Sequence, residues 1–100
     1  MYRGGLAEAV LAAAEEIADR PLYVSLDIDV VDPAFAPGTG TPECGGATSA
    51  ELLAALAGLA GRRVVGFDLV EVSPPTDLSA RTSLLAATVV REALLRFAAV

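Results

Sequence analysis

Two kinds of segment alternate along this chain. In one kind the apolar residues recur at helical spacing, and in the other they form a short continuous run. Residues 5–19 place apolar side chains on one face of a helix and acidic side chains on the other. Arg20-Pro21 ends this segment, because a proline disfavours helical backbone in the residue before it. Residues 22–26 then form an apolar run that is too short for a helix, which predicts a buried strand.

The second half of the chain repeats this order. Thr48 and Glu51 have the spacing of a capping box, which predicts a helix to about residue 60 with Gly61 as its C-terminal glycine. The apolar run 64–70 predicts a second strand, and Asp77 or Ser79 is expected to cap a helix to about residue 98. The order predicts an α/β fold, a three-layer α-β-α fragment with two parallel strands.

Acidic residues stand where both predicted strands end. Asp27, Asp29 and Asp32 follow the first strand, and Glu71 follows the second. Ligands of parallel sheets bind beyond the carboxyl ends of the strands. If the backbone stays extended, Asp27 and Asp29 point to the same side, roughly 7 Å apart along the chain. Their mutual repulsion is relieved by a cation, so the pattern predicts a site for Mg²⁺, Ca²⁺ or Mn²⁺.

The acids have other interpretations, of which the plainest is a solvated acidic loop. A calcium-binding loop is excluded, because counting from Asp27 the sixth residue is Asp32 instead of Gly and the twelfth is Gly38 instead of Glu. The apolar strand followed by D-x-D-x-V also resembles the first motif of haloacid-dehalogenase-type phosphohydrolases. That family normally needs a lysine for the phosphate, and this chain has none, which weakens this interpretation without removing it.

The long loop after the first strand resembles a family signature. From Ser25 it reads S-L-D-I-D-V-V-D-P-A-F-A-P-G-T-G-T-P, followed by Gly45-Gly46, and it is similar to the ureohydrolase family of arginases and agmatinases. The block G-F-D-L-V-E-V-S-P-P-T-D at residues 66–77 resembles the C-terminal block of the same family. Gly38 and Glu43 make the resemblance closest to agmatinase. Residues 1–100 are therefore expected to be a C-terminal segment of an arginase-like α/β domain, and an incomplete one.

The resemblance implies a role for each matching residue. Asp27 corresponds to a carboxylate that bridges two Mn²⁺ ions, and Asp29 to a ligand of one of them. Glu71 corresponds to the catalytic acid that receives the substrate guanidinium, and Thr41 to a substrate-binding residue of the pocket. Thr76 departs from the aromatic residue expected there. The implied reaction is metal-assisted hydrolysis of a guanidino compound to urea and an amine, with agmatine giving putrescine.

The absence of histidine limits what this chain is expected to do alone. Ureohydrolases also use histidine ligands from an N-terminal part, and this chain contains no histidine. The isolated chain is therefore expected to be inactive and to need a missing N-terminal segment or assembly into a homo-oligomer. A non-catalytic fragment that acts by packing or subunit association is the alternative.

Composition narrows the classes of protein to which this chain can belong. The net charge of −6 argues against a nucleic-acid surface, which needs a basic patch. No apolar stretch of about 18 residues predicts a membrane span. The single cysteine, Cys44, permits no internal disulfide, which suits a cytoplasmic protein, and without a histidine to activate it Cys44 is not expected to be a nucleophile.

Overall fold

A computed structural model describes residues 5–98, which form an α/β unit with two parallel strands. The elements follow one another as expected from the sequence pattern, with two short 3₁₀ helices added after the strands. In chain order they are α1 (Gly5–Ile17), β1 (Leu22–Asp27), η1 (Ile28–Val30), α2 (Ser49–Gly58), β2 (Val64–Val70), η2 (Pro74–Thr76) and α3 (Arg81–Phe97).

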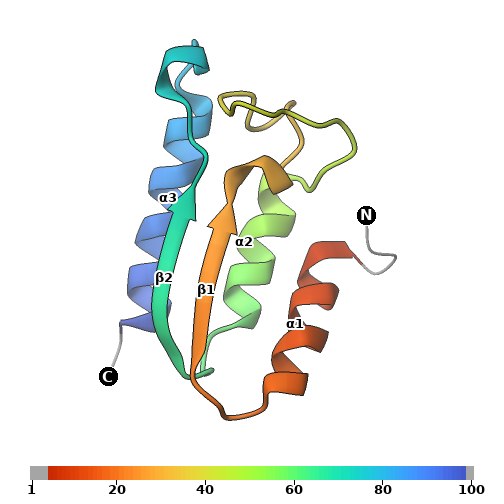
Figure 1. Cartoon of the computed structure of the whole chain (residues 1–100), viewed down its shortest axis with the longest axis vertical. Helices are drawn as coiled ribbons and strands as arrows, with labels where there is room; N and C mark the ends of the chain where they lie inside the picture. Colours follow the sequence, from red (N-terminus) through yellow and green to blue (C-terminus); the bar gives the residue numbers. More distant parts are fainter. Residues whose placement is uncertain (1–4, 99–100) are drawn as a thin grey trace.

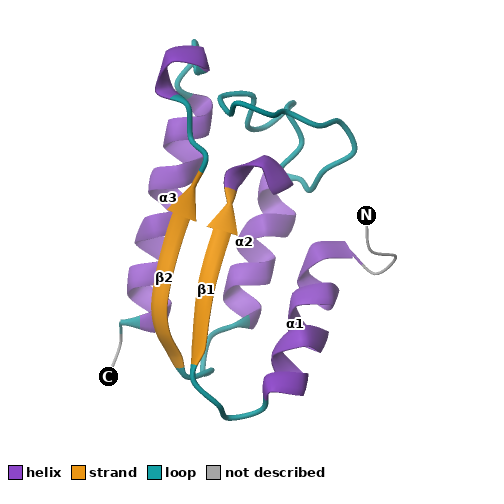
Figure 2. Ribbon diagram, viewed as in Figure 1, coloured by secondary structure: helices purple, strands orange, loops and turns teal. Residues whose placement is uncertain are grey.

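Strands β1 and β2 lie side by side and point in the same direction (Figure 1). The register pairs Tyr23 with Gly66 near the start and Asp27 with Val70 at the end. Both carboxyl ends therefore reach the same edge of the sheet, where the loop after η1 and the segment after β2 also lie (Figure 2). The predicted α/β class with parallel strands is confirmed.

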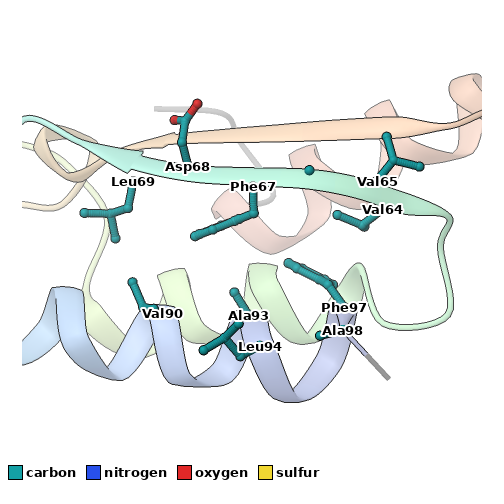
Figure 3. Close-up of a pocket in the computed structure, with 11 residues that line it drawn as sticks. Val64, Val65, Phe67, Asp68, Leu69, Val90, Ala93, Leu94, Phe97 and Ala98 are labelled. Atoms are coloured by element: carbon teal, nitrogen blue, oxygen red, sulfur yellow. The ribbon is translucent and has the colours of Figure 1, made fainter. Parts of the chain in front are cut away.

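Helices α2 and α3 cover one face of the sheet, and α1 packs beside α2 (Figure 1). Figure 3 shows Phe67 and Leu69 on the side of β2 that faces α3, whereas Val65 and Asp68 point away. On that opposite face Tyr23 and Val65 are 59% and 64% exposed. Of the three predicted layers, residues 5–98 thus form the sheet and the α2–α3 layer. The core between these layers consists of Leu26, Ile28, Val31, Ala36, Leu52, Leu56, Leu85, Val89 and Ala93.

The open face of the sheet carries a small polar network centred on Asp68. Tyr23 Oη and Ser25 Oγ each donate a 2.7 Å hydrogen bond to its carboxylate. The bonds from Ser25 and Tyr23 lower the pKa of Asp68, and the bond to Asp68 raises the pKa of Tyr23. The Tyr23 ring occupies the space beside Gly66, where a Cβ atom would lie 2.4 Å from the ring. Asp68 is thus a structural hydrogen-bond acceptor on this face, and Gly66 permits the close approach of the Tyr23 ring.

Capping explains where the helices begin. The predicted capping box is present at α2, since Thr48 Oγ1 accepts from the Glu51 amide and the Glu51 carboxylate accepts from the Thr48 amide. The N-cap residue of α3 is Ala80, and not Asp77 or Ser79 as expected, but the Asp77 carboxylate accepts from the Thr82 and Ser83 amides of the first turn. Helices α1 and α2 end two residues before the predicted positions, at Ile17 and Gly58.

Two apolar grooves border the sheet. One of about 490 Å³ lies between β2 and α3 and is lined by residues such as Phe67, Val90 and Phe97 (Figure 3). The other, of about 320 Å³, lies between α1, β1 and α2. Among residues 5–98, no helix combines the length and the apolar character that crossing a membrane requires.

Candidate functional site

The first predicted metal ligand, Asp27, ends β1 and is exposed. Its Oδ1 atom accepts a 3.0 Å hydrogen bond from the Asp29 amide, so Asp27 is the N-cap of η1. The expectation that Asp27 and Asp29 share one side of an extended strand is therefore wrong, because Asp29 belongs to a 3₁₀ turn. The turn has a packing reason: it lets Ile28 and Val31 enter the core, where they are 0% and 1% exposed.

The turn places Asp29 against the long loop instead. Thr41 Oγ1 donates a 2.9 Å hydrogen bond to Asp29 Oδ2. Both residues belong to the predicted site, but the sequence does not predict this contact, because they are 12 positions apart. Thr41 is exposed and Asp29 is half-buried, so the pair lies at the surface of the carboxyl edge.

The two aspartates retain oxygen atoms for a cation. Within residues 5–98, neither Asp27 Oδ2 nor Asp29 Oδ1 accepts a hydrogen bond, while the other oxygen of each is held in place. Oriented carboxylates of this kind suit Mg²⁺, Ca²⁺ or Mn²⁺. No group of three or more candidate ligands occurs among these residues. The donor set therefore fits part of a metal site, and further ligands would have to come from outside it.

Glu71 lies immediately after β2, next to the residue that pairs with Asp27. Its backbone is left-handed, with φ of +74°, a conformation that costs a non-glycine residue roughly 1–2 kcal/mol. Such a conformation persists only where the surroundings enforce it. Here an isolated antiparallel bridge joins Thr39 to Val72, and the Ser73 amide donates a 2.7 Å hydrogen bond to Gly38 O. Those contacts hold the turn that presents Glu71, whose side chain is exposed.

Asp32, the third acid of the cluster, has a different task. Its carboxylate accepts 2.9 Å hydrogen bonds from the amides of Ala34 and Gly45. These bonds, that of Ala34 first, lower the pKa of Asp32. Gly46 closes the same loop at a point where a Cβ atom would lie 2.6 Å from Val30 O. Asp32 thus shapes the loop and uses its oxygens within it, unlike Asp27 and Asp29.

Thr39 is a residue of this region that the sequence analysis missed. Its side chain is 4% exposed, and Oγ1 has no hydrogen-bond partner within residues 5–98. It precedes Thr41 by two positions in the T-G-T motif, but its burial results from the bridge to Val72. The only signal in the sequence was its place in the family-like loop.

Direct contacts therefore join most of the predicted site. Asp27 bonds to the Asp29 backbone, and Asp29 bonds to Thr41. Glu71 is placed next to them by the strand register instead of by a side-chain contact. All four predicted residues lie at the carboxyl edge of the sheet, where a small ligand and a cation could be bound together.

Comparisons with known proteins show the family of this chain. The Arginase family model matches residues 1–96. Guanidinopropionase of Pseudomonas aeruginosa is 53% identical over 88 residues, which are 87% of this chain and 28% of that protein. Agmatinase of Bacillus cereus is 48% identical over 97 residues, which are 95% of this chain and 33% of that protein.

A solved structure shows the same fold. Proclavaminate amidinohydrolase from Streptomyces clavuligerus superposes with a TM-score of 0.87 at 49% identity, over 94% of this chain and 31% of that one. The chain thus spans about a third or less of the length of these relatives. The match covers nearly all of residues 1–100, and it includes both strands and the acidic loop. The chain belongs to the Arginase family, the ureohydrolases.

Proposed function

We propose that this chain forms part of the active site of a hydrolase that cleaves a guanidino compound into urea and an amine. The observation that supports it most is the arrangement at the carboxyl edge of the sheet. There Asp29 is bonded to both Asp27 and Thr41, and Glu71 follows the strand partner of Asp27. One side of the edge offers carboxylates for a cation, and the other offers a carboxylate for a cationic substrate.

Asp27 and Asp29 are the proposed ligands of Mn²⁺, two ions in the complete site. When bound, Mn²⁺ lowers the pKa of a water molecule so that it becomes a nucleophile near neutral pH. The chain's own contribution is orientation. The Asp29 amide holds one oxygen of Asp27, and Thr41 holds one oxygen of Asp29. Each carboxylate then presents its other oxygen without first losing side-chain freedom.

Glu71 is the proposed substrate-binding and catalytic residue. A guanidinium is planar and donates in a fork that matches a carboxylate, and such charge-assisted bonds are about twice as strong as neutral ones. The left-handed backbone at Glu71, with φ of +74°, turns the chain sharply at the strand end. Glu71 would hold the guanidinium so that its carbon faces the nucleophile, and Thr41 would line the same pocket.

Agmatine is the proposed substrate, with putrescine as the amine product. Guanidino acids are a second candidate, because the relative named guanidinopropionase is 53% identical to this chain and the relative named agmatinase 48%. The two classes differ at the end remote from the guanidinium, where agmatine carries an ammonium and a guanidino acid carries a carboxylate. A direct comparison of both compounds therefore decides between them.

The complete site is proposed to require more than residues 1–100. The chain has no histidine, and the described residues contain no cluster of three ligands. We therefore expect the isolated chain to be inactive, with the missing ligands supplied by an N-terminal segment or by a homo-oligomer in the cytoplasm. A non-catalytic packing fragment, or a phosphohydrolase, would lack metal-dependent urea release.

Urea production tests this proposal. The intact mass of the protein that carries this sequence in its source cells first establishes which form to assay. That form, supplied with Mn²⁺, should release urea from agmatine or guanidinopropionate, and a chelator should stop the release. Phosphate release from a phosphomonoester, without urea release, would identify the phosphohydrolase. If the protein releases neither urea nor phosphate, the non-catalytic fragment is the interpretation that remains.

A further inference from the structure

Gly38 joins three separate segments of the chain through its backbone. Its amide donates a 2.8 Å hydrogen bond to Thr82 Oγ1 in the first turn of α3, where both residues are buried. Its carbonyl oxygen accepts a 2.7 Å hydrogen bond from the amide of Ser73, which follows β2. The long loop, the segment after β2 and the start of α3 therefore meet at one residue.

Asp77 completes this meeting point from the side of α3. Its carboxylate accepts hydrogen bonds from the Thr82 amide at 3.2 Å, from the Ser83 amide at 2.8 Å and from Ser83 Oγ at 2.7 Å. Its side chain is 7% exposed and packs directly against the Gly38 backbone. A Cβ atom on Gly38 would lie 2.5 Å from Asp77 Cβ. Only glycine fits this position without a shift of the loop or the helix cap.

The junction is close in sequence to both proposed substrate-binding residues. Gly38 precedes Thr41 by three positions, and Ser73 follows Glu71 by two. We propose that the Gly38 junction, formed by Gly38, Ser73, Asp77 and Thr82, positions Thr41 and Glu71 relative to each other. The roles of Thr41 and Glu71 rest on the proposed function, but the positioning itself can be measured without it.

The reason for assigning this role lies in what else holds the two residues. Both side chains are exposed, and the left-handed backbone of Glu71 needs support from its surroundings. The buried hydrogen bond from the Gly38 amide to Thr82 Oγ1 supports this backbone more strongly than an exposed bond would. The bridge between Thr39 and Val72 is the next residue pair on each segment, so it depends on the same junction.

Amide hydrogen exchange and chemical shifts of this chain, recorded by NMR, test the positioning directly. Thr82→Val removes the acceptor of the Gly38 amide and keeps the side-chain shape. Exchange at Gly38 and Ser73 should become roughly tenfold faster, and the amide shifts of Thr41 and Glu71 should move. Thr82→Ser keeps the hydroxyl and should restore the wild-type values. Thr88→Val, also on α3, removes a hydroxyl that bonds only within the helix at Leu84 O and should leave Thr41 and Glu71 unchanged.

Gly38→Ala provides a second route if the Thr82 variant does not fold. It pushes the loop away from Asp77 while leaving every side chain of α3 intact. The same shift changes at Thr41 and Glu71 are expected. In either variant, amide exchange at positions 38 and 73 could change while the amide shifts of Thr41 and Glu71 keep their wild-type values. That result would mean that the junction is only structural, and it would overturn the proposal.

A kinetic readout extends the test to the active, Mn²⁺-loaded protein that carries this sequence. Thr82→Val should raise KM for the guanidino substrate roughly tenfold, with Mn²⁺ content unchanged and Thr82→Ser near wild type. A fall in kcat of the same size, roughly tenfold, with KM unchanged would contradict a role in positioning the substrate-binding residues. If the wild-type protein releases no urea at all, the proposed function fails, while the exchange measurements still decide the role of the junction.

Discussion

Thr41 Oγ1 lies 2.9 Å from Asp29 Oδ2 and bonds a loop residue to a proposed metal ligand. Thr41→Val keeps the shape and removes this bond, so Asp29 becomes free to rotate. Partners of this kind contribute roughly 10–100-fold to metal affinity, and we expect a loss of roughly tenfold. Titration of the metal-competent protein with Mn²⁺ measures it, with Thr41→Ser as the control. Unchanged affinity in the valine variant would show that Asp29 does not depend on Thr41.

Glu71 and Asp27 should separate substrate binding from metal binding. Glu71→Gln removes the charge that receives the guanidinium, and a hydrogen bond to a charged group contributes about 1.5–3 kcal/mol. KM should therefore rise by roughly 10–100-fold while Mn²⁺ content stays constant. Asp27→Asn should instead lose Mn²⁺. Metal analysis beside steady-state kinetics checks both variants, and loss of Mn²⁺ from the glutamine variant would refute the role given to Glu71.

The left-handed backbone of Glu71 predicts that a glycine at this position makes the chain more stable but impairs substrate binding. Glycine adopts φ of +74° freely, so Glu71→Gly should raise the free energy of unfolding by about 1 kcal/mol while impairing substrate binding. Ala80, with φ of +60° and no proposed role in the site, is the matched control. Ala80→Gly should stabilise the chain similarly and leave substrate binding unchanged. Urea denaturation measures stability, and a Glu71→Gly variant that is less stable than wild type would contradict the expectation.

The buried hydroxyl of Thr39 leads to a prediction about stability alone. Thr39 is 4% exposed, and its Oγ1 has no partner within the described part of the chain. Thr39→Val removes this unpaired polar atom, and the free energy of unfolding should rise by about 1 kcal/mol. Thr82→Val provides the contrast, because Thr82 Oγ1 accepts from Gly38 and its loss should destabilise. If Thr39→Val destabilises as well, the Thr39 hydroxyl has a partner in solution.

Stability should fall in acid, because three carboxylates have lowered pKa values. Hydrogen bonds from Ala34, Ser25 and Ser83 are the first causes at Asp32, Asp68 and Asp77 respectively. A lowered pKa in the folded state means that the stabilisation is fully present above the unfolded value of about 3.9. It is lost as the pH falls through the folded values.

The midpoint of urea-induced unfolding, recorded from about pH 6 downward, measures this loss. The midpoint should be nearly constant until the pH approaches about 4 and should then decrease. Asp32→Asn should show a smaller decrease, because one linked carboxylate is gone. Glu43→Gln, whose parent side chain is exposed in the same loop, should follow the wild-type curve. A wild-type midpoint that does not change in acid would contradict the hydrogen bonds assigned to these carboxylates.

The sequence by itself determined the order of the α-helices and strands and the choice of candidate site residues. Apolar periodicity and the capping box at Thr48 depend on neighbours within a few positions, so the pattern predicts them well. The acids Asp27, Asp29 and Glu71 follow the strands, and parallel strands bring their carboxyl ends together. The family followed from the loop motif, because it has many residues at fixed offsets.

Only the tertiary structure decided how these residues meet. Asp29 leaves the strand because burial of Ile28 and Val31 requires a turn, which local alternation cannot anticipate. The sequence places Asp32 with the site acids, but its carboxylate oxygens accept hydrogen bonds from backbone amides of the loop. Gly38 and Thr82 are 44 positions apart and meet through a buried hydrogen bond. Contacts over such separations arise from the packing of whole elements, so no local pattern of side chains specifies them.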